Sequence, residues 1–397
     1  MNQDDLASIL WLIEHADAEL NSQQLPTDPL ALVSYFRKRH DAERTRLLCE
    51  LLELRTRAEA KFTLASKMFF TRRGYEQASS EIVANHKAKR FPKSDVADLC
   101  CGIGGDSIAL AQHGCNLAIV DKSPSTLELA KANLQVHNAS PSANLAEDVR
   151  EIDFSRFEAW HLDPDRRVED QRRSSPDHCE PPLSEFLAID GLPASGAVKL
   201  SPAADAQHLL DSGVELEWIG SNRECQQQVA WFGSLAQSPS KRTATWITKD
   251  AIGGVEAHCL VEVPDCDVVE VEVQTPKYVY EPRAVVLAAG LEATLAEQHG
   301  LKCLATGIPY LCSDERIESR FLRRFETLAQ MPFRKKSLLQ QAKQRGLCIR
   351  EVKKRGVDIV PSELLRELSS TDGDREAVVI LFPKQQSVTA LLARRDD

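Results

Sequence analysis

The segment VADLCCGIGGDSIALA, residues 96–111, constrains the fold more than any other part of the chain. A strand-like apolar run passes through Gly102, Gly104 and Gly105 into a helical pattern. Glycine lets the backbone approach a ligand closely at such a turn. At the first strand end of a doubly wound sheet this turn faces the crevice where nucleotides bind. The segment therefore predicts a cofactor site lined by Asp98 and the three glycines.

Further short apolar runs follow, each ending in a polar or glycine-rich turn and most leading into a helical stretch: NLAIVD, AWHLD and GAVKLS. Strands that alternate with helices predict a parallel sheet covered on both faces. The clearest of these helices follows VDKSP, with Leu127, Ala130 and Leu134 on one face and Asn138 placed to end it. The fold class is therefore α/β.

Two acidic residues stand at the ends of the next predicted strands. Asp121 lies about 20 residues past the glycines, where a carboxylate can accept both hydrogen bonds of a ribose diol. Asp148 follows the third strand, where a carboxylate can accept from an adenine amino group. These positions suit either a nicotinamide dinucleotide or S-adenosylmethionine.

The glycine spacing favours S-adenosylmethionine. A dinucleotide fingerprint requires GxGxxG, whereas Ser107 stands where the third glycine would be. Asp106 beside the turn would also repel a pyrophosphate, while a cationic sulfonium is attracted to carboxylates.

The motifs DLCCGIGG, VDKS, AED and DPDRR, in this order and spacing, resemble those of a class I S-adenosylmethionine-dependent methyltransferase with a Rossmann-like doubly wound sheet. FFTRRGYEQASSEIVANHKAKRF and DLCCGIGGD resemble more narrowly a bacterial group with a THUMP-like C-terminal domain, and the core is also similar to trimethylguanosine synthase. The resemblance implies that one set of residues holds the cofactor: Asp98, Gly102, Gly104, Gly105, Asp106, Asp121, Lys122, Asp148 and Val149.

The fourth strand end, Asp163-Pro164-Asp165-Arg166-Arg167, is the predicted acceptor site. Amine methyltransferases usually carry [DN]PP[YFW] there, so that an acceptor side chain and a carbonyl direct the amine nitrogen at the methyl group. Asp163 and Pro164 match this pattern, but Asp165 and Arg166 replace the second proline and the aromatic residue. Asp163, Pro164 and Arg166 are the predicted catalytic residues. Arg166 and Arg167 are predicted to hold base or phosphate, and Lys199 is a predicted substrate-binding residue that lies near enough in this topology to assist.

The regions on either side of this core differ from it in pattern. Residues 1–75 form a predicted helical module, in which Leu6, Ile9, Leu10 and Ile13 recur at helical spacing. Residues 76–275 form the predicted methyltransferase domain, with Ser79 or Ser80 predicted to cap the helix beginning near Glu81. Residues 276–397 form the predicted α/β THUMP-like domain, with strand-like YVYEPRAVVLAAGL and AVVILF between basic helical stretches.

Basic residues concentrate in two stretches, although the whole chain is acidic. The chain has 49 basic and 59 acidic residues, a net charge of −10. Residues 316–355 carry 13 basic against 3 acidic residues, and residues 55–93 carry 10 against 3. We expect structured RNA, tRNA or rRNA, to bind the first stretch. The predicted substrate-binding residues there lie in a pattern of helical spacing: Arg323, Arg324, Lys335, Lys336, Lys353 and Lys354.

Composition indicates a folded protein that resides in the cytoplasm. The N-terminus is acidic where a signal peptide is basic, and no uncharged apolar stretch is long enough to span a membrane. The 11 cysteines include no CxxC pair and the 10 histidines lie singly, so neither a disulfide framework nor a metal site is expected.

The function predicted from sequence is direct methyl transfer from S-adenosylmethionine to a base nitrogen of structured RNA. Transfer to a pyrimidine carbon is disfavoured, because Ser201 stands at the fifth strand end where a cysteine nucleophile would be needed. Two alternatives stay open: a methyltransferase acting on a small molecule or protein, and a non-catalytic RNA-binding protein with a relic cofactor site. The sequence leaves the oligomeric state open.

Overall fold

The structure is a computed structural model of the chain and describes residues 3–21, 25–166, 175–222, 224–249, 254–267, 275–368, 373–384 and 387–396. The chain divides into two compact units. The first comprises Met1–Ile219, Gln226–Lys241 and Lys249–Ala257, and the second comprises Gly220–Cys225, Arg242–Thr248 and His258–Asp397.

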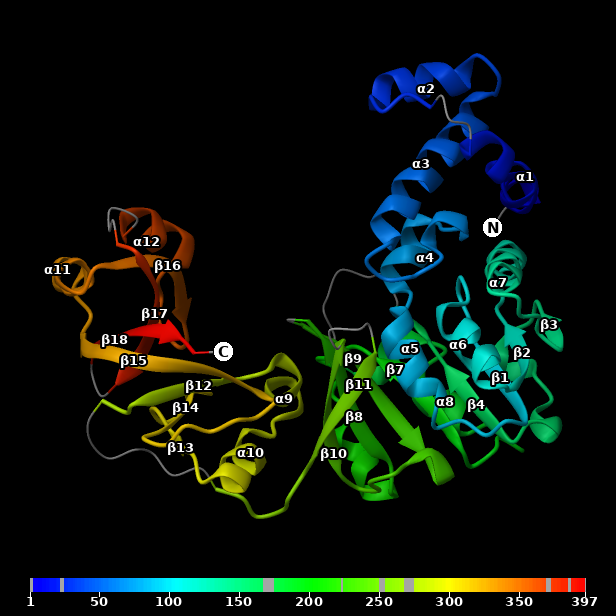
Figure 1. The fold of residues 1–397 in the computed structure, drawn as a ribbon. Helices are drawn as coiled ribbons and strands as arrows, with labels where there is room; N and C mark the ends of the chain where they lie inside the picture. Colours follow the sequence, from blue (N-terminus) through cyan, green and yellow to red (C-terminus); the bar gives the residue numbers. More distant parts are fainter. Residues whose placement is uncertain are drawn as a thin grey trace. The chain divides into compact units, whose positions relative to one another are not determined.

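The first unit contains the predicted alternation of strands and helices (Figure 1). Its helices are α1 (Gln3–Leu20), α2 (Pro29–Arg37), α3 (Ala42–Ala58), α4 (Arg72–Gln77), α5 (Glu81–Ala88), α6 (Gly105–His113), α7 (Pro124–Val136) and α8 (Leu183–Leu187). Short 3₁₀ helices are η1 (Ala65–Lys67), η2 (Val149–Glu151), η3 (Phe154–Arg156), η4 (Pro176–His178), η5 (Gln207–Ser212) and η6 (Gly233–Leu235).

The larger sheet has the order β11-β10-β8-β9-β7-β4-β1-β2-β3. Its strands are β1 (Asp95–Leu99), β2 (Asn116–Val120), β3 (Ala143–Leu145), β4 (Ala159–Leu162), β7 (Gly196–Leu200), β8 (Glu215–Ser221), β9 (Glu224–Phe232), β10 (Arg242–Lys249) and β11 (Val255–Val261). Five neighbouring strands of this sheet run parallel to one another: β7, β4, β1, β2 and β3. The strand β9 is antiparallel to β7. The predicted parallel sheet is confirmed, and its strand order reverses beside β1, which puts the glycine turn at the switch point.

Two helices test the sequence patterns closely. In α7 the predicted face is buried, and Asn138 follows the helix with φ +56°, a left-handed conformation that stops it. In α1 the buried residues are Ile9, Leu12, Ala16 and Leu20, whereas Leu10 is 45% exposed. The helical spacing thus predicted α1 correctly, and the buried stripe of this helix runs through Leu12 rather than Leu10.

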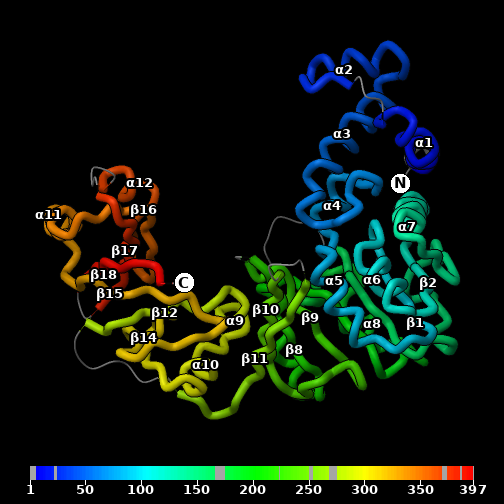
Figure 2. Tube along the Cα trace, viewed as in Figure 1, coloured from blue at the N-terminus to red at the C-terminus, as the bar shows by residue number. Residues whose placement is uncertain are grey.

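The second unit is built on a seven-stranded sheet of order β13-β14-β12-β15-β18-β17-β16. Its strands are β12 (Tyr278–Pro282), β13 (Lys302–Cys303), β14 (Leu311–Ser313), β15 (Leu322–Pro332), β16 (Leu347–Lys354), β17 (Arg375–Lys384) and β18 (Ser387–Arg395). Its helices are α9 (Ala284–Ala289), α10 (Glu292–His299), α11 (Lys335–Gln344) and α12 (Pro361–Leu368). β16 and β17 are parallel, and the final strand returns between β15 and β17 (Figure 2).

Two sequence predictions in this unit were wrong. AVVLAA, predicted as strand, forms α9, because Val285 and Val286 make a short buried apolar run that suits either element. FLRRFETLAQMPF, included in a helical pattern, forms β15, and only the segment around Lys335 is helical. Leu322 and Phe325 are both buried and lie three positions apart with two arginines between them, a spacing that over a short window resembles one face of a helix.

The long connection after β4 has some regular structure. β5 (Asp165–Arg166) and β6 (Cys179–Glu180) pair as a small antiparallel sheet. In the described ranges of the chain, no helix has both the length and the apolar character that a membrane span requires.

Candidate functional site

The glycine turn between β1 and α6 leaves open space in front of its backbone. Gly102 and Gly104 have φ values of +56° and +84°, which favour glycine. A Cβ on Gly104 would lie 3.3 Å from Ala130 Cα, whereas a Cβ on Gly102 would meet nothing within 4 Å. Gly104 is therefore needed for packing against α7, and Gly102 keeps the exposed face of the turn free.

Asp121 reaches the same turn from the end of β2. Its carboxylate accepts from the N–H of Gly102 at 3.3 Å and from the N–H of Ser123 at 2.9 Å. Burial raises the pKa of Asp121 although both N–H groups favour the charged form. Lys122 beside it is exposed. The predicted proximity of Asp121 to the glycines is thus present in the structure.

Asp98 and Asp106 lie in the protein interior beside the turn. Asp98 is fully buried, and its two oxygens accept from Ser107 Oγ and from His161 Nδ1, the latter at 2.8 Å. Asp106 forms an ion pair with Lys87, whose Nζ lies 2.7 Å from Oδ1, and its Oδ2 accepts a hydrogen bond from Ser79 Oγ at 2.8 Å. Both carboxylates are occupied by protein groups, so any direct contact of theirs with a cofactor stays a prediction.

Asp148 and Val149 lie beyond β3. Asp148 is the N-cap of η2 and accepts from the Arg150 guanidinium at 2.7 Å, while Val149 is buried. The hydrogen bonds from Arg150 lower the pKa of Asp148 to about 2. Asp148 is charged near neutral pH and partly exposed, but both oxygens of its carboxylate already accept hydrogen bonds from the Arg150 guanidinium.

The predicted acceptor residues meet a lysine at the ends of β4 and β7. Lys199 Nζ donates to Asp163 Oδ2 at 2.6 Å and to the carbonyl oxygen of Gln77 at 2.7 Å. Pro164 next to Asp163 is buried. Adjacent parallel strands bring Asp163 and Lys199 together, as the topology predicts. The contact with Gln77 brings in the end of α4.

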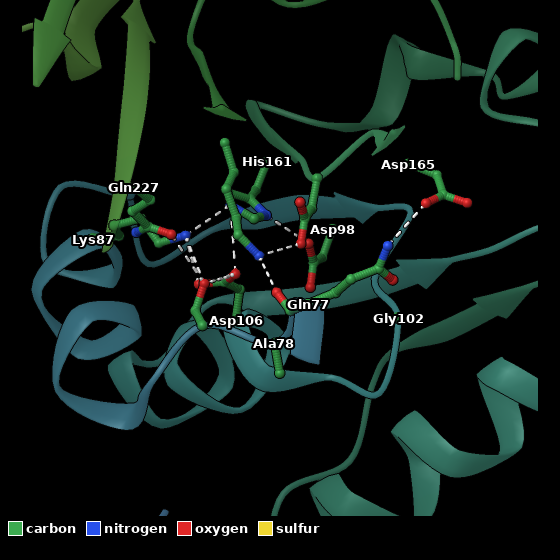
Figure 3. A network of polar contacts seen from close by, with 12 residues as sticks. Gln77, Ala78, Lys87, Asp98, Gly102, Asp106, His161, Asp165 and Gln227 are labelled. Carbon is green, nitrogen blue, oxygen red and sulfur yellow. Dashed lines mark hydrogen bonds and ion pairs between the residues drawn. The ribbon is translucent and has the colours of Figure 1, made fainter. Parts of the chain in front are cut away.

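α4 is also held to the residue after Pro164. Gln77 Nε2 donates to Asp165 Oδ1 at 2.9 Å, which Figure 3 shows, and Arg73 forms an ion pair with the same carboxylate. Arg166 has its backbone in β5, paired with Cys179. Arg167 lies outside the described residues. The contacts of Arg73 and Gln77 were not predicted, because nothing in the sequence links residues about 90 positions apart.

The six predicted basic residues of the second unit differ in how far their charges are available to contact a polyanion. Arg324 is buried and donates to Asp396 and Glu318, and Lys353 donates to Glu281 at 2.9 Å. Arg323 lies 3.8 Å from the same Glu281, and exposed Lys335 pairs with Glu367. Lys336 is exposed and Lys354 half-buried, and among the described residues neither has an acidic partner. Lys336 is thus the most available of the six for a polyanion.

Two residues that organise the interior of the site, Lys87 and His161, were not predicted from the sequence. Lys87 on α5 is fully buried, and its ammonium contacts Asp106, Ser79 and His161 (Figure 3). His161 stood as the one ionisable residue in the apolar run AWHL, and that signal could have identified it. Lys87 gave no signal, because it lies among other lysines that are ordinarily solvated.

The predicted capping role of Ser79 and Ser80 was wrong. Ser80 occupies the N-cap position of α5 without a side-chain capping bond, and its hydroxyl donates instead to Gln226 at 2.9 Å. Ser79 donates to Asp106. Both hydroxyls tie the start of α5 to neighbouring elements.

These residues fit a nucleoside cofactor on two structural observations. The face of Gly102 is open, so a ligand can approach its backbone, and the Asp121 carboxylate is adjacent to that turn and accepts a hydrogen bond from the Gly102 N–H. No group of three or more potential metal ligands occurs among the described residues.

Comparisons with known proteins agree with this geometry. Residues 93–152 match the model of the RNA cap guanine-N2 methyltransferase family, and residues 322–395 match the THUMP domain-like family. Two uncharacterised S-adenosylmethionine-dependent methyltransferases, from Mycobacterium tuberculosis strains CDC 1551 and H37Rv, are each 28% identical over 347 residues, which is 85% of this chain and 93% of theirs.

A crystal structure described as a candidate methyltransferase from Porphyromonas gingivalis W83 has the same fold. Its TM-score is 0.75 with 21% identity, and the match covers 100% of this chain and 99% of that one. The similarity to the solved structure shows the shared fold. The curated relatives and the family matches show that this chain is an S-adenosylmethionine-dependent methyltransferase whose residues 322–395 resemble a THUMP domain.

Proposed function

We propose that this protein methylates a base nitrogen of structured RNA, tRNA or rRNA, in the cytoplasm. One observation carries the choice of nitrogen: the end of β4 already binds an amine. Lys199 Nζ is held by a carboxylate oxygen of Asp163 and a backbone carbonyl oxygen of Gln77, at 2.6 and 2.7 Å. This pair of acceptors is what an amine substrate needs in order to be oriented for attack.

The proposed cofactor residues divide by the part of S-adenosylmethionine that each would hold. Gly102, Gly104 and Gly105 would offer backbone to the methionine moiety, and Asp121 beside Lys122 would accept from the ribose. Asp148 and Val149 would face the adenine. Asp98 and Asp106 would support the glycine turn from the protein interior. When bound, S-adenosylmethionine supplies an electrophilic methyl group.

The residues at the end of β4 would orient the acceptor. A substrate amine would either displace the Lys199 ammonium from Asp163 or share the Asp163 carboxylate with Lys199. The N–H groups of the amine would donate hydrogen bonds to this carboxylate. Pro164 fixes the backbone of this strand end, and Arg166 and Arg167 would hold base or phosphate. No strong base is required, because the amine nitrogen loses its proton after the new bond forms.

The choice of RNA rests on the second unit and on both family matches. The predicted domains, 1–75, 76–275 and 276–397, remain proposals, and the THUMP-like match lies in the last of them. Lys336 and neighbouring Arg334 are exposed at the start of α11, and we assign the electrostatic contact with phosphates to this region together with Lys354.

A radiolabelled methyl transfer assay tests this proposal. Wild type should label total RNA in the presence of the donor, and Asp163→Ala should reduce the rate at least a hundredfold while its donor affinity stays within twofold. Asp177→Ala, which changes a carboxylate that contacts Ser184, is the matched control and should retain the wild-type rate. Label in protein or in small molecules instead of RNA would replace the proposed substrate, and donor binding without any label would favour a relic site.

A further inference from the structure

The helix α4 contacts both halves of the proposed active site. On the cofactor side, a Cβ on Gly74 would clash with Ile103 Cγ2, so the absence of a side chain at Gly74 allows α4 to lie against the middle of the glycine turn. Just beyond the end of α4, a Cβ on Gly105 would lie 3.4 Å from Ala78 Cβ. The helix α4 is therefore packed directly against the glycine turn.

On the acceptor side, the carboxylate of Asp165 holds two residues of α4. Asp165 Oδ1 accepts a hydrogen bond from Gln77 Nε2 at 2.9 Å, as Figure 3 shows. Asp165 Oδ2 forms an ion pair with Arg73. Arg73 and Gln77 are four positions apart and therefore lie on the same face of the helix. Both oxygens of Asp165 thus hold one face of α4.

The end of α4 supplies a backbone oxygen to the acceptor site. The carbonyl oxygen of Gln77 accepts from Lys199 Nζ at 2.7 Å, and the Asp163 carboxylate accepts from the same ammonium at 2.6 Å. A second lysine, Lys61, donates to two other carbonyl oxygens at this end of the helix, at 2.8 and 3.3 Å. Because Gln77 and Asp163 belong to separate elements, the distance between their oxygens depends on where α4 lies.

Asp165 stands where the acceptor motif of amine methyltransferases usually has its second proline. A proline side chain has no hydrogen-bond acceptor and could hold neither Arg73 nor Gln77. The side chains of Arg73 and Asp165 are 62% and 36% exposed, and exposed ion pairs contribute little to stability. The contacts of Asp165 are therefore better explained by the placement of α4 than by the stability of the fold.

We propose that Asp165 is a positioning residue for the methyl acceptor: it holds α4 where the Gln77 carbonyl and the Asp163 carboxylate can bind one amine together. This inference rests on the proposed function, in which these two acceptors orient the substrate nitrogen. In this role Asp165 touches neither the amine nor the cofactor, and it acts through Arg73 and Gln77. A small displacement of an orienting group slows a transfer reaction strongly, so loss of these contacts should lower kcat.

Steady-state methyl transfer to RNA at saturating donor tests this role. Asp165→Ala should lower kcat roughly tenfold or more, while the KM for RNA and the donor affinity stay within about twofold. The double variant Arg73→Ala, Gln77→Ala removes both donors to Asp165, keeps the backbone carbonyl, and should lower kcat by the same factor. Combining all three substitutions should cause no further loss, because they break the same contacts.

Two further variants separate positioning from a general loss of structure. Arg72→Ala is the matched control, since it removes an exposed arginine of the same helix that pairs with Glu53 of α3 at 3.2 Å. It should keep the wild-type kcat. Asp165→Glu keeps the carboxylate and should retain more activity than Asp165→Ala. The melting temperature and the stoichiometry of donor binding should hardly change in any of these variants.

The possible outcomes distinguish this inference from the proposed function. A wild-type kcat in Asp165→Ala, or losses that multiply in the combined variant, overturns the role of Asp165 and leaves the proposed function standing. A lower KM for RNA with an unchanged kcat also overturns it, and would identify Asp165 as a charge that only repels RNA. If the wild type transfers no methyl group to RNA, the proposed function fails and this inference fails with it.

Discussion

Lys87 and Asp106 show how single residues hold the site together. Their charged atoms lie 2.7 Å apart in the interior, where each would be destabilising without the other. Because Lys87 belongs to α5 and Asp106 to the first turn of α6, the pair joins the segment before β1 to the glycine turn.

Asp106→Asn tests the strength of this pair and its dependence on pH. At pH 7 the variant should unfold with a free energy about 3–5 kcal/mol below that of wild type, since it leaves the Lys87 ammonium buried without a counter-charge. The pKa of Asp106 is lowered on folding, so its stabilisation is complete above the unfolded carboxyl pKa and is lost as the pH falls through the folded pKa.

Urea unfolding at pH 7, 4 and 3 measures the difference in the free energy of unfolding between wild type and Asp106→Asn. The stability gap between wild type and Asp106→Asn should be largest at pH 7 and should narrow below about pH 4. A gap that stays constant across this range would show that Asp106 does not act through its charge.

At the scale of elements, the glycine turn separates a packing role from a binding role. Gly102 and Gly114 flank α6, and both have positive φ values, +56° and +103°. Gly102 faces open space, whereas Gly114 is the C-cap of α6 and faces only the side chain of Lys93. An alanine is more strained at φ +103° than at φ +56°, which lies in the left-handed region that other residues can adopt, so Gly114 controls for backbone strain and Gly102 tests the open face.

Gly102→Ala should therefore weaken donor binding at least tenfold, because the added methyl group occupies the space in front of the turn. Gly114→Ala should lower stability by about 1 kcal/mol and leave donor affinity within twofold. Calorimetry and thermal unfolding of both variants provide the comparison. Equal losses of affinity in the two variants would mean that the turn does not face the cofactor.

The elements also show how far sequence patterns extend. The strands around the glycine turn were predictable, because short apolar runs such as NLAIVD are bounded by turn residues and alternate with helical stretches. The helix α9 and the strand β15 were not predictable, because their short sequences fit both the helical period and the strand period. Packing against the rest of the folded chain decides whether such a segment becomes a helix or a strand.

The site divides in the same way. Asp121, Asp163 and Lys199 were predictable, because parallel strand ends converge on one edge of the sheet. The Lys87–His161–Asp98 arrangement was not, since it depends on side chains from separate elements meeting in the interior. Likewise, the commitment of Arg324 to Asp396 removes from the surface a cation that composition alone counts as available.

At the scale of the whole molecule, the proposed function assigns methyl transfer to one unit and RNA binding to the other. The overall charge of −10 opposes polyanion binding, so exposed cations such as Arg334 and Lys336 have to supply local attraction. Attraction of this kind is sensitive to salt.

Arg334→Glu combined with Lys336→Glu should weaken RNA binding and reduce the slope of log affinity against log salt by about 1.5, the effect of two lost phosphate contacts. Arg37→Glu combined with Lys38→Glu makes the same charge change at the exposed end of α2 and should leave the slope unaltered. Filter binding from 50 to 200 mM salt gives both slopes. Identical slopes for the two double variants would exclude the start of α11 from the RNA contact.

The most direct test of the central claim is mass spectrometry of the nucleosides from cells that lack this protein. If the protein methylates RNA as proposed, one N-methylated nucleoside should disappear from tRNA or rRNA, return when the wild-type gene is supplied, and not return with Asp163→Ala. An unchanged set of methylated nucleosides, or full restoration by Asp163→Ala, would contradict it.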